Sequence, residues 1–511
     1  MIDLRRVTHP GPRGVPNANS LARRPHVVVV GAGIAGLAAA TGLAERGVSV
    51  EILERQAYLG GRVGGWTERL GDGAEVANNR GFHAFFRQYY NLRTLLRRTD
   101  PGLERLRAVE DYPLVDAQGR RDTFRGLPKT PPWNALVFAL RSPTFRMRDL
   151  VRLNAGAAAP LAAVSVPETY EQLDDVDAET FLRDINFPVA ARHLAFEVFA
   201  RSFFARPERL SAAELATMFH IYFLGSSEGL VFDVAGSNFS TALWDPLGQY
   251  LIEHGVRLRT EVTAESISIG GSRLLQVHDG SGTTVDADGV VLATDVGALQ
   301  RIVAASPGLG DDRWRTRVAR LQTAPPFAVQ RLWLDAPVES DRPAFLGTGG
   351  LEPVDNISVV SSYESEAAQW ARAHHGSVVE VHSYSVADPQ RVPDLRQRML
   401  ARLHQLYPET ADAGIVGETL LVRDDCPLFN PGSFADRPTV HTPVDGLVLA
   451  GDGIRIDLPV ALMERAATTG WSAANRLLAG WGVGGHTLHT VPVQGRSPVL
   501  RRLASREGRV S

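Results

Sequence analysis

Cysteine, lysine and long apolar runs are nearly missing from this 511-residue chain, and each absence excludes a class of protein. Cys426 is the only cysteine, so an intramolecular disulfide and a cysteine-based metal cluster are excluded. No apolar run reaches the roughly 20 residues that span a bilayer, since the longest candidate, 27–40, is broken by glycines. Lys129 is the only lysine, and the formal net charge of −3 gives no basis for binding nucleic acid. The pair His374-His375 has no third ligand at helical spacing, so no metal site is expected.

Both ends of the chain have the composition of loose segments. We expect residues 1–25, rich in Arg, Pro, Gly and Asn, to be a flexible leader, and residues 481–511 to be a loose C-terminal tail. Arginine pairs at 5–6 and 23–24 resemble an export signal, but a nucleotide-binding strand follows the second pair in place of an apolar export segment. The chain is therefore expected to be cytoplasmic, which fits its low cysteine content.

A β-α-β unit opens the ordered part of the sequence. Residues 26–30 form a β-branched run typical of a buried parallel strand, 34–46 predict a helix, and 48–53 predict a second strand. Gly31, Gly33 and Gly36 match G-x-G-x-x-G between strand and helix, where they permit a tight turn, close approach of a pyrophosphate and close helix packing. The helix start at Ile34 and Ala35 offers free N–H groups to phosphates.

An acidic residue and two further motifs indicate which dinucleotide binds. Glu54 ends the second strand about 20 residues after the glycines, where a carboxylate binds ribose hydroxyls and repels the 2′-phosphate of NADP. Gly61 and Arg62, in 60–63, add a second flexible backbone and a cation. Asp452, within 449–453, is suited to ribityl hydroxyls, and a helix beginning near residue 461 would direct its dipole at the flavin ring. These features favour FAD over NAD.

The order of predicted elements gives an α/β fold. We predict a glutathione-reductase-like, FAD-binding Rossmann domain interleaved with a mixed α+β substrate domain. The FAD-binding domain is expected over residues 26–100, 245–305 and 425–480, and the substrate domain over 101–244 and 306–424.

Glu54, the 60–62 motif, 450–452 and 463–466 together resemble the FAD-dependent amine oxidase and phytoene desaturase superfamily. The stretches 80–92 and 218–225 are more specifically similar to bacterial isorenieratene synthases, the β-carotene desaturase/methyltransferases, over about residues 25–480. The resemblance implies non-covalent FAD and the following cofactor-binding residues: Gly31, Gly33, Ile34, Ala35, Gly36, Glu54, Arg55, Gly61, Arg62, Gly81, Phe82, His83, Val262, Gly451, Asp452, Leu462 and Met463.

The same resemblance implies oxidation of the β-ionone ring of β-carotene, with a 1,2-methyl shift, to an aromatic-ring carotenoid of the isorenieratene type. Candidate catalytic residues are Asp457 and Arg455, which alternatively form a surface ion pair, and His83, which alternatively makes a structural hydrogen bond. Glu464 is either a flavin-site group or a helix N-terminal carboxylate. Alternatives for the whole protein are an acyclic carotenoid desaturase, an FAD-dependent carotenoid isomerase and, less favoured, an amine oxidase.

Partners follow from the insolubility of a carotenoid in water. The apolar stretch 133–141, with Arg146 and Arg148 beyond it, predicts either a peripheral membrane contact or a core helix. The electron acceptor is expected to be a quinone or oxygen. Aromatic residues either line a polyene channel or fill the core; they are Phe82, Phe85, Phe86, Tyr89, Tyr90, Phe219, Tyr222 and Phe223.

Overall fold

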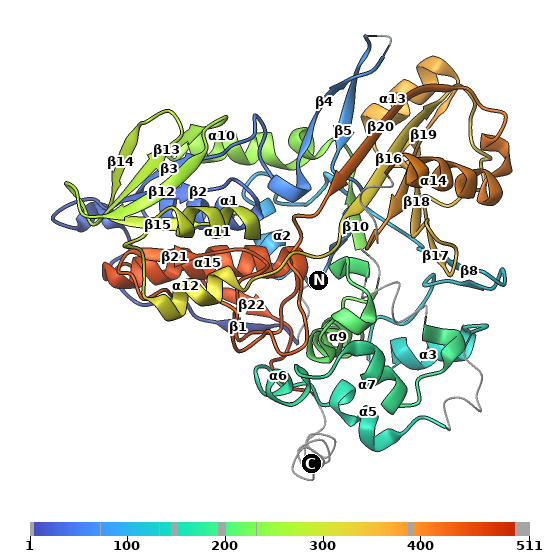
Figure 1. The fold of residues 1–511 in the computed structure, drawn as a ribbon, viewed down its shortest axis with the longest axis horizontal. Helices are drawn as coiled ribbons and strands as arrows, with labels where there is room; N and C mark the ends of the chain where they lie inside the picture. The colour runs from blue at the N-terminus through green and yellow to red at the C-terminus, as the bar shows by residue number, and fades with distance from the viewer. Residues whose placement is uncertain are drawn as a thin grey trace.

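The computed structural model describes residues 5–71, 73–131, 133–144, 152–192, 201–230, 232–386 and 392–495. Its elements form three groups (Figure 1): a parallel sheet with two long helices on the left, a larger sheet at the upper right, and a set of helices below that sheet.

The first group is a five-stranded sheet in the order β11-β3-β2-β15-β21, in which every pairing is parallel. Its strands are β2 (His26–Val30), β3 (Ser49–Leu53), β11 (Arg257–Arg259), β15 (Gly289–Leu292) and β21 (Leu447–Leu449). Short β-branched runs suit these positions because both faces of such a sheet are covered. All five strands come from the segments predicted for FAD binding.

Two helices pack together on this sheet. The first, α1 (Ile34–Ala44), is buried along its whole length. The second, α15 (Leu462–Gly480), crosses α1 so closely that a Cβ at Gly470 would lie 2.2 Å from the Ala35 carbonyl oxygen. The crossing connects the N-terminal and C-terminal parts of the predicted FAD domain.

The second group is a seven-stranded sheet in the order β20-β16-β19-β18-β17-β8-β9. Its strands are β8 (Leu114–Asp116), β9 (Arg121–Asp122), β16 (Phe327–Leu334), β17 (Phe345–Gly349), β18 (Asn356–Val359), β19 (Ser377–Ser383) and β20 (Ile415–Arg423). All pairings are antiparallel except β17 with β8. Every strand comes from the segments predicted for the substrate domain.

Helices make up most of the third group, which lies between residues 133 and 219. They are α3 (Trp133–Arg141), α5 (Ala155–Ala162), α6 (Glu168–Leu173), α7 (Ala178–Asp184) and α9 (Ala212–Phe219). A small sheet, β6-β10-β7, is built from β6 (Phe85–Phe86), β7 (Leu106–Ala108) and β10 (Phe232–Ala235).

Smaller elements complete the parallel-sheet side of the molecule. They include the sheet of β12 (Ala264–Ile269), β13 (Leu275–Asp279) and β14 (Thr284–Ala287), and the helices α2 (Tyr90–Leu96), α10 (Asp245–Glu253), α11 (Val296–Ala304) and α12 (Asp312–Ala319). The β4 (Gly65–Arg69) and β5 (Glu75–Asn79) hairpin extends beside the larger sheet, which α13 (Ser365–His374) and α14 (Val392–Leu406) flank.

The expectation of loose ends at 1–25 and 481–511 is wrong for parts of both segments. β1 (Val7–His9) pairs antiparallel with β22 (Leu488–Thr490), and His9 Nε2 lies 2.8 Å from Thr490 Oγ1. The N–H of His489 also donates to Asn91 Oδ1 at 2.9 Å. Strands of three residues are too short to show an alternating pattern, so Gly- and Pro-rich composition concealed them.

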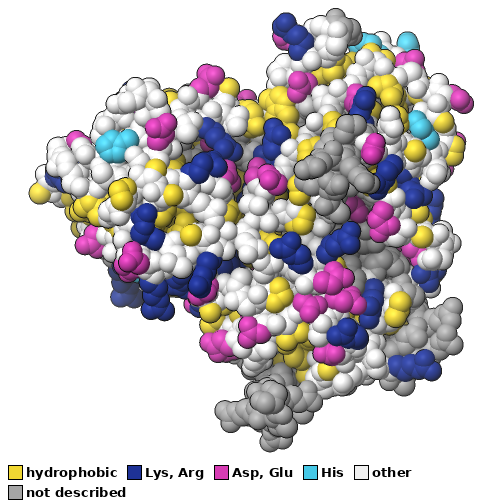
Figure 2. Space-filling model, viewed as in Figure 1, with side chains coloured by type: hydrophobic (Ala, Val, Ile, Leu, Met, Phe, Trp, Pro, Cys, Tyr) yellow, Lys and Arg dark blue, Asp and Glu magenta, His cyan; other side chains and the backbone are white. Residues whose placement is uncertain are grey.

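Among the described residues, no helix is both long enough and apolar enough to cross a bilayer. Figure 2 shows basic and acidic side chains interspersed over most of the displayed face, as the small net charge leads one to expect.

Candidate flavin and substrate site

A large cavity lies where the groups of elements meet, and its lining comes from both sheets and from the helical segment. Its volume of about 720 Å³ falls within the roughly 300–1,000 Å³ typical of ligand pockets. Its lining includes the glycine-rich turn after β2 and many aromatic side chains. A single space therefore connects a dinucleotide-type loop to an apolar chamber.

The glycine-rich turn takes the conformation that its sequence predicts. Gly31 has a φ of +98°, and a Cβ there would lie 2.6 Å from the Ala293 carbonyl oxygen. Gly36 packs so closely that a Cβ would lie 1.9 Å from the Gly31 oxygen. Gly31, Gly33, Ile34 and Ala35 line the cavity, whereas Gly36 lies behind it and permits helix packing.

Glu54 lies beside this turn. Its carboxylate accepts hydrogen bonds from the N–H groups of Ala32 at 2.7 Å and Gln56 at 2.8 Å. The N–H of Val262 donates to the Glu54 carbonyl oxygen at 2.9 Å, which brings that residue to the same edge of the cavity. Arg55 also lines the cavity and pairs with Asp295 at 3.0 Å.

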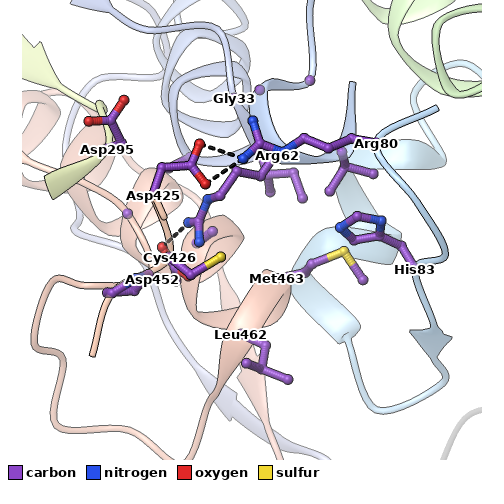
Figure 3. Close-up of a pocket in the computed structure, with 18 of the residues that line it drawn as sticks. Gly33, Arg62, Arg80, His83, Asp295, Asp425, Cys426, Asp452, Leu462 and Met463 are labelled. Atoms are coloured by element: carbon purple, nitrogen blue, oxygen red, sulfur yellow. Dashed lines mark hydrogen bonds and ion pairs between the residues drawn. The ribbon is translucent and has the colours of Figure 1, made fainter. Parts of the chain in front are cut away.

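Two ion pairs join residues that line the cavity (Figure 3). Arg62 pairs with Asp452, and Arg80 pairs with Asp425 through both carboxylate oxygens. Cys426 lies next to these groups, and burial raises the pKa of its thiol to about 11. The thiol is consequently protonated at neutral pH, and the protonated form is a poor nucleophile.

The start of α15 forms the next part of the wall. Gly451 is held by the Thr469 hydroxyl, which accepts its N–H at 2.9 Å. Leu462 and Met463 line the cavity, and Leu462 has a φ of +52°, an unusual backbone conformation for a residue with a Cβ. No side chain caps this helix start, so its N–H groups are available to a ligand.

Of the two alternatives for Glu464, a flavin-site group or a helix N-terminal carboxylate, the structure shows the second. The helix whose N-terminus it contacts is α2 and not α15, to which Glu464 itself belongs. Its Oε1 accepts from the Asn91 N–H at 2.8 Å and its Oε2 from the Leu92 N–H at 3.0 Å, both in the first turn of α2. This contact fixes α2 against α15 and places Glu464 outside the cavity lining.

The segment from Gly81 to His83 contributes two lining residues, Phe82 and His83. Gly81 has a φ of +88° and lies behind the wall, beside a small neighbouring cavity. His83 Nδ1 lies 3.0 Å from the Gly81 carbonyl oxygen, so this nitrogen donates and Nε2 carries the lone pair. Burial lowers the pKa of His83 to about 4. The ring is therefore neutral at physiological pH.

The expectation that Asp457 and Arg455 flank the reacting ring is not met, because neither residue lines the cavity. Arg455 Nε donates to Asp457 Oδ1 at 2.9 Å, and half of the Asp457 side chain is exposed. The Arg455 guanidinium also lies 4.1 Å from the centre of the Phe434 ring. The surface ion pair, the alternative weighed for these residues, is the arrangement found.

The predicted aromatic residues divide between cavity and core. Those that line the cavity are Phe82, Phe86, Tyr89, Tyr222 and Phe223, joined by Tyr112, Phe124, Phe203, Phe204, Phe232, Phe327, Tyr384 and Phe429. Phe85 and Tyr90 pack in the core, and Phe219 stacks on Phe223 at 4.8 Å. A wall of this composition suits a long apolar ligand.

Sequence reasoning missed several lining residues, among them Arg80, Asp425, His382 and Tyr384. Arg80 begins the stretch 80–92 but was given no role there, and Asp425 lies in a segment that carries no motif. A signal did exist for the others, because Glu380, His382 and Tyr384 occupy every second position, the first two on one face of β19 and Tyr384 directly after its end.

The parallel sheet, its glycine-rich turn and the second mixed sheet define a two-domain, dinucleotide-dependent oxidoreductase. A model of one such family, the flavin containing amine oxidoreductases, matches residues 34–478, and the chain belongs to this family. It is accordingly a flavoprotein.

Named relatives are similar to nearly the whole chain. A carotenoid phi-ring synthase of Streptomyces griseus is 56% identical over 97% of this chain and 95% of the relative. A carotenoid phi-ring synthase of Chlorobaculum tepidum is 27% identical over 94% and 92%. A zeta-carotene desaturase of Synechocystis is 27% identical over 89% and 97%.

Solved structures support the fold. A triple mutant of putrescine oxidase superposes with a TM-score of 0.65 at 17% identity, covering 89% of this chain and 99% of the other. Cyclohexylamine oxidase from Brevibacterium oxydans superposes with a TM-score of 0.62 at 16% identity, covering 90% and 99%.

Proposed function

We propose that this chain is an FAD-dependent carotenoid desaturase that converts the β-ionone ring of β-carotene to an aromatic ring with a 1,2-methyl shift. The observation that carries the proposal is the single cavity joining the glycine-rich turn to an aromatic chamber, in a chain 56% identical to a phi-ring synthase. An amine oxidase is less well supported, because a lysine near the flavin ring is typical of many enzymes that resemble that family, and Lys129, the only lysine, is not among the lining residues.

The residues around the turn fit FAD. Gly31, Gly33, Ile34 and Ala35 would hold its pyrophosphate, and Glu54 would hold the adenosine ribose. Arg55 and Val262 would border the adenosine half, and Gly61 and Arg62 the pyrophosphate. Gly451, Asp452, Leu462, Met463, Phe82 and His83 would surround the ribityl chain and the ring, with Gly81 behind them.

The protonated thiol of Cys426 supports non-covalent attachment. Precipitation of the protein with acid should release all of the flavin into the supernatant. Flavin that stays with the pellet would contradict non-covalent binding.

The reaction requires removal of four hydrogens from each ring: two from C2, which gains the methyl group, and one each from C3 and C4. This corresponds to two hydrides and two protons, and the flavin, when bound, supplies the two-electron acceptor for each hydride. The chain's own tasks are to orient the ring, exclude water from the cations and accept the protons. The aromatic chamber serves the first two tasks.

The carotenoid reaches the site from a membrane surface in this proposal. Trp133, Leu136 and Leu140 lie on one face of α3 and are 58%, 44% and 56% exposed. On the opposite face Phe138 stacks on Phe124 at 5.1 Å, and Phe124 lines the cavity. This helix thus separates the aromatic chamber from an exposed apolar strip suited to a bilayer surface. Arg146 and Arg148 lie outside the described residues.

A vesicle assay tests the membrane contact. The variant Leu136→Glu/Leu140→Glu should lose co-sedimentation with phosphatidylglycerol vesicles, whereas Ile252→Glu, equally apolar and 50% exposed on α10, should retain it. Equal binding by both variants would remove α3 from the proposal.

Anaerobic turnover with and without a quinone in the vesicles then distinguishes a quinone from oxygen as electron acceptor.

Product analysis tests the reaction itself. Co-expression in cells that accumulate β-carotene should yield a pigment lighter by four hydrogens per reacted ring, detected by liquid chromatography and mass spectrometry. A product of unchanged mass but altered geometry would indicate an isomerase. Unchanged β-carotene beside flavin-loaded protein would exclude this substrate and direct attention to acyclic carotenoids.

A further inference from the structure

A row of three polar side chains leads from the buried sheet into the cavity. Glu380 and His382 lie on one face of β19, and Tyr384 follows at the end of the strand. His382 Nε2 lies 3.2 Å from Glu380 Oε2, and the Tyr384 hydroxyl lies 3.2 Å from His382 Nδ1. His382 and Tyr384 line the cavity, whereas Glu380 lies behind them.

The charge on Glu380 fixes the direction of these hydrogen bonds. Arg331 donates to it through Nε at 2.8 Å and pairs through Nη2 at 2.7 Å. Burial alone would raise the pKa of Glu380, but Arg331 and the bond from His382 outweigh it and lower the pKa to about 2. An anionic carboxylate only accepts, so His382 Nε2 donates to it, Nδ1 carries the lone pair, and the Tyr384 hydroxyl donates to Nδ1.

This row lies beside the proposed flavin-ring residues. A Cβ at Gly81 would lie 3.1 Å from His382 Cε1, so the glycine leaves the space that the histidine ring occupies. Phe82 and His83, the next two residues, line the same cavity. The Tyr384 ring packs edge-on against Phe204 at 5.1 Å, among the aromatic side chains of the chamber.

We propose that Tyr384, supported by His382 and Glu380, is the proton acceptor for the carbocations formed during ring desaturation. The inference rests on the proposed function. When a ring C–H bond breaks, its electron pair forms the new C=C bond and its proton passes to the Tyr384 oxygen. The original Tyr384 proton moves to His382 Nδ1, which leaves an imidazolium next to the Glu380 carboxylate. The hydride lost earlier in the same step has gone to the flavin, so each step removes one hydride and one proton, and two steps account for the four hydrogens lost from a ring.

His83, the histidine that the sequence suggested for catalysis, is less suited to this task. Burial above all, together with the cations of Arg80 and Arg62, lowers its pKa to about 4 despite the opposing effect of the bond to Gly81. A proton accepted by His83 would therefore be repelled by two arginine cations. A proton accepted by His382 would instead be attracted by the adjacent Glu380 carboxylate. We assign His83 to the wall and Tyr384 to catalysis, with His382 and Glu380 as positioning residues.

The decisive variant is Tyr384→Phe, which removes one hydroxyl and leaves the ring. We expect at least a 100-fold loss of turnover, the lower end of the range for general acid–base catalysis, with unchanged flavin content and melting temperature. The matched control is Tyr407→Phe, which deletes a tyrosine hydroxyl of a buried side chain outside the cavity and should keep native turnover. Retention of a third or more of native turnover by Tyr384→Phe would overturn the proposal.

Two measurements distinguish catalysis from a structural role. Native turnover should slow in D₂O because the Tyr384 proton exchanges with solvent, and this isotope effect should disappear in His382→Gln. Nitrogen NMR of histidine-labelled protein, independent of activity, should show the Nε2–H tautomer for His382, identified by its loss in His382→Gln. An Nδ1–H tautomer would refute the relay. If the native chain itself fails to aromatise β-carotene, the proposed function fails; if only the variants behave as native, this inference alone fails.

Discussion

Removal of Glu214 should destabilise the junction between the helical segment and the flavin domain. This carboxylate lies on α9, is fully buried, and accepts one bond from Arg437 and one from Arg465, each at 2.7 Å. Arg465 belongs to α15 and also donates to the Val460 carbonyl oxygen at 3.0 Å, which fixes the start of the helix that lines the cavity. The variant Glu214→Ala would leave two buried guanidinium groups without their shared anion.

The size of the effect follows from the burial. Breaking a buried ion pair by removing one partner costs about 3–5 kcal/mol. With an unfolding entropy of about 2.1 cal/mol/K per residue, a chain of 511 residues should lose roughly 3–5 °C in melting temperature. Scanning calorimetry is the suitable assay, because comparing calorimetric with van't Hoff enthalpy shows whether the interleaved domains unfold together. Flavin content should fall in parallel.

A matched variant tests the electrostatic reasoning. Replacing all three residues, as Glu214→Leu/Arg437→Met/Arg465→Met, should restore most of the lost stability because no buried charge remains unpaired. Burial raises the pKa of Glu214, but Arg465 and Arg437 outweigh it and hold the pKa below 4.5. The stabilisation by Glu214 is thus present above pH 4.5 and is lost as the pH falls. The melting temperature of Glu214→Ala should therefore fall less steeply toward acid pH than that of the native chain. A loss below about 1 kcal/mol would refute the argument.

Three further predictions concern single positions. Gly31→Ala should abolish flavin binding, because its φ is +98° and the added Cβ would meet the Ala293 oxygen at 2.6 Å; Gly308→Ala, with nothing within 4 Å, should bind normally. Asp457→Asn should keep turnover within about twofold of the native value, since an exposed ion pair contributes about 0–1 kcal/mol. A large loss of turnover would indicate that Asp457 takes part in the reaction. The lowered pKa of His83 favours its neutral form in the folded state, so its contribution is present above pH 6.5 and lost as pH falls toward 4. Urea unfolding of His83→Gln should accordingly show less acid destabilisation than the native chain.

The flavin half of the molecule was largely predictable because its signals are local. The β2 strand, the glycine-rich turn and the start of α1 lie within a dozen residues, and each requirement is set by neighbours in the chain. Gly31 is needed for its own backbone angle and Gly36 for its approach to the Gly31 oxygen. Burial and hydrogen-bond partners at such positions follow from the motif itself.

The substrate half was less predictable because its residues meet only in three dimensions. Arg455 and Asp457 lie close in sequence to Asp452, yet the loop turns outward and they pair with each other. Tyr384 lies far from every flavin motif in the sequence and reaches the cavity only because β19 crosses the second sheet. Sequence distance from a motif is thus a poor guide to distance from the reacting atoms.

The charge arrangement of the cavity bears on substrate class more directly than the fold does. Solved amine oxidases share this architecture at 16–17% identity, so the fold alone does not separate amines from carotenoids. A protonated amine gains most from a carboxylate that lacks another cation, but the lining residues Asp425 and Asp452 are each paired with an arginine. Aromatic rings supply much of the remaining wall. A neutral polyene buries its apolar surface there without involving the two arginines, whereas an ammonium group bound by Asp425 or Asp452 would have to displace one.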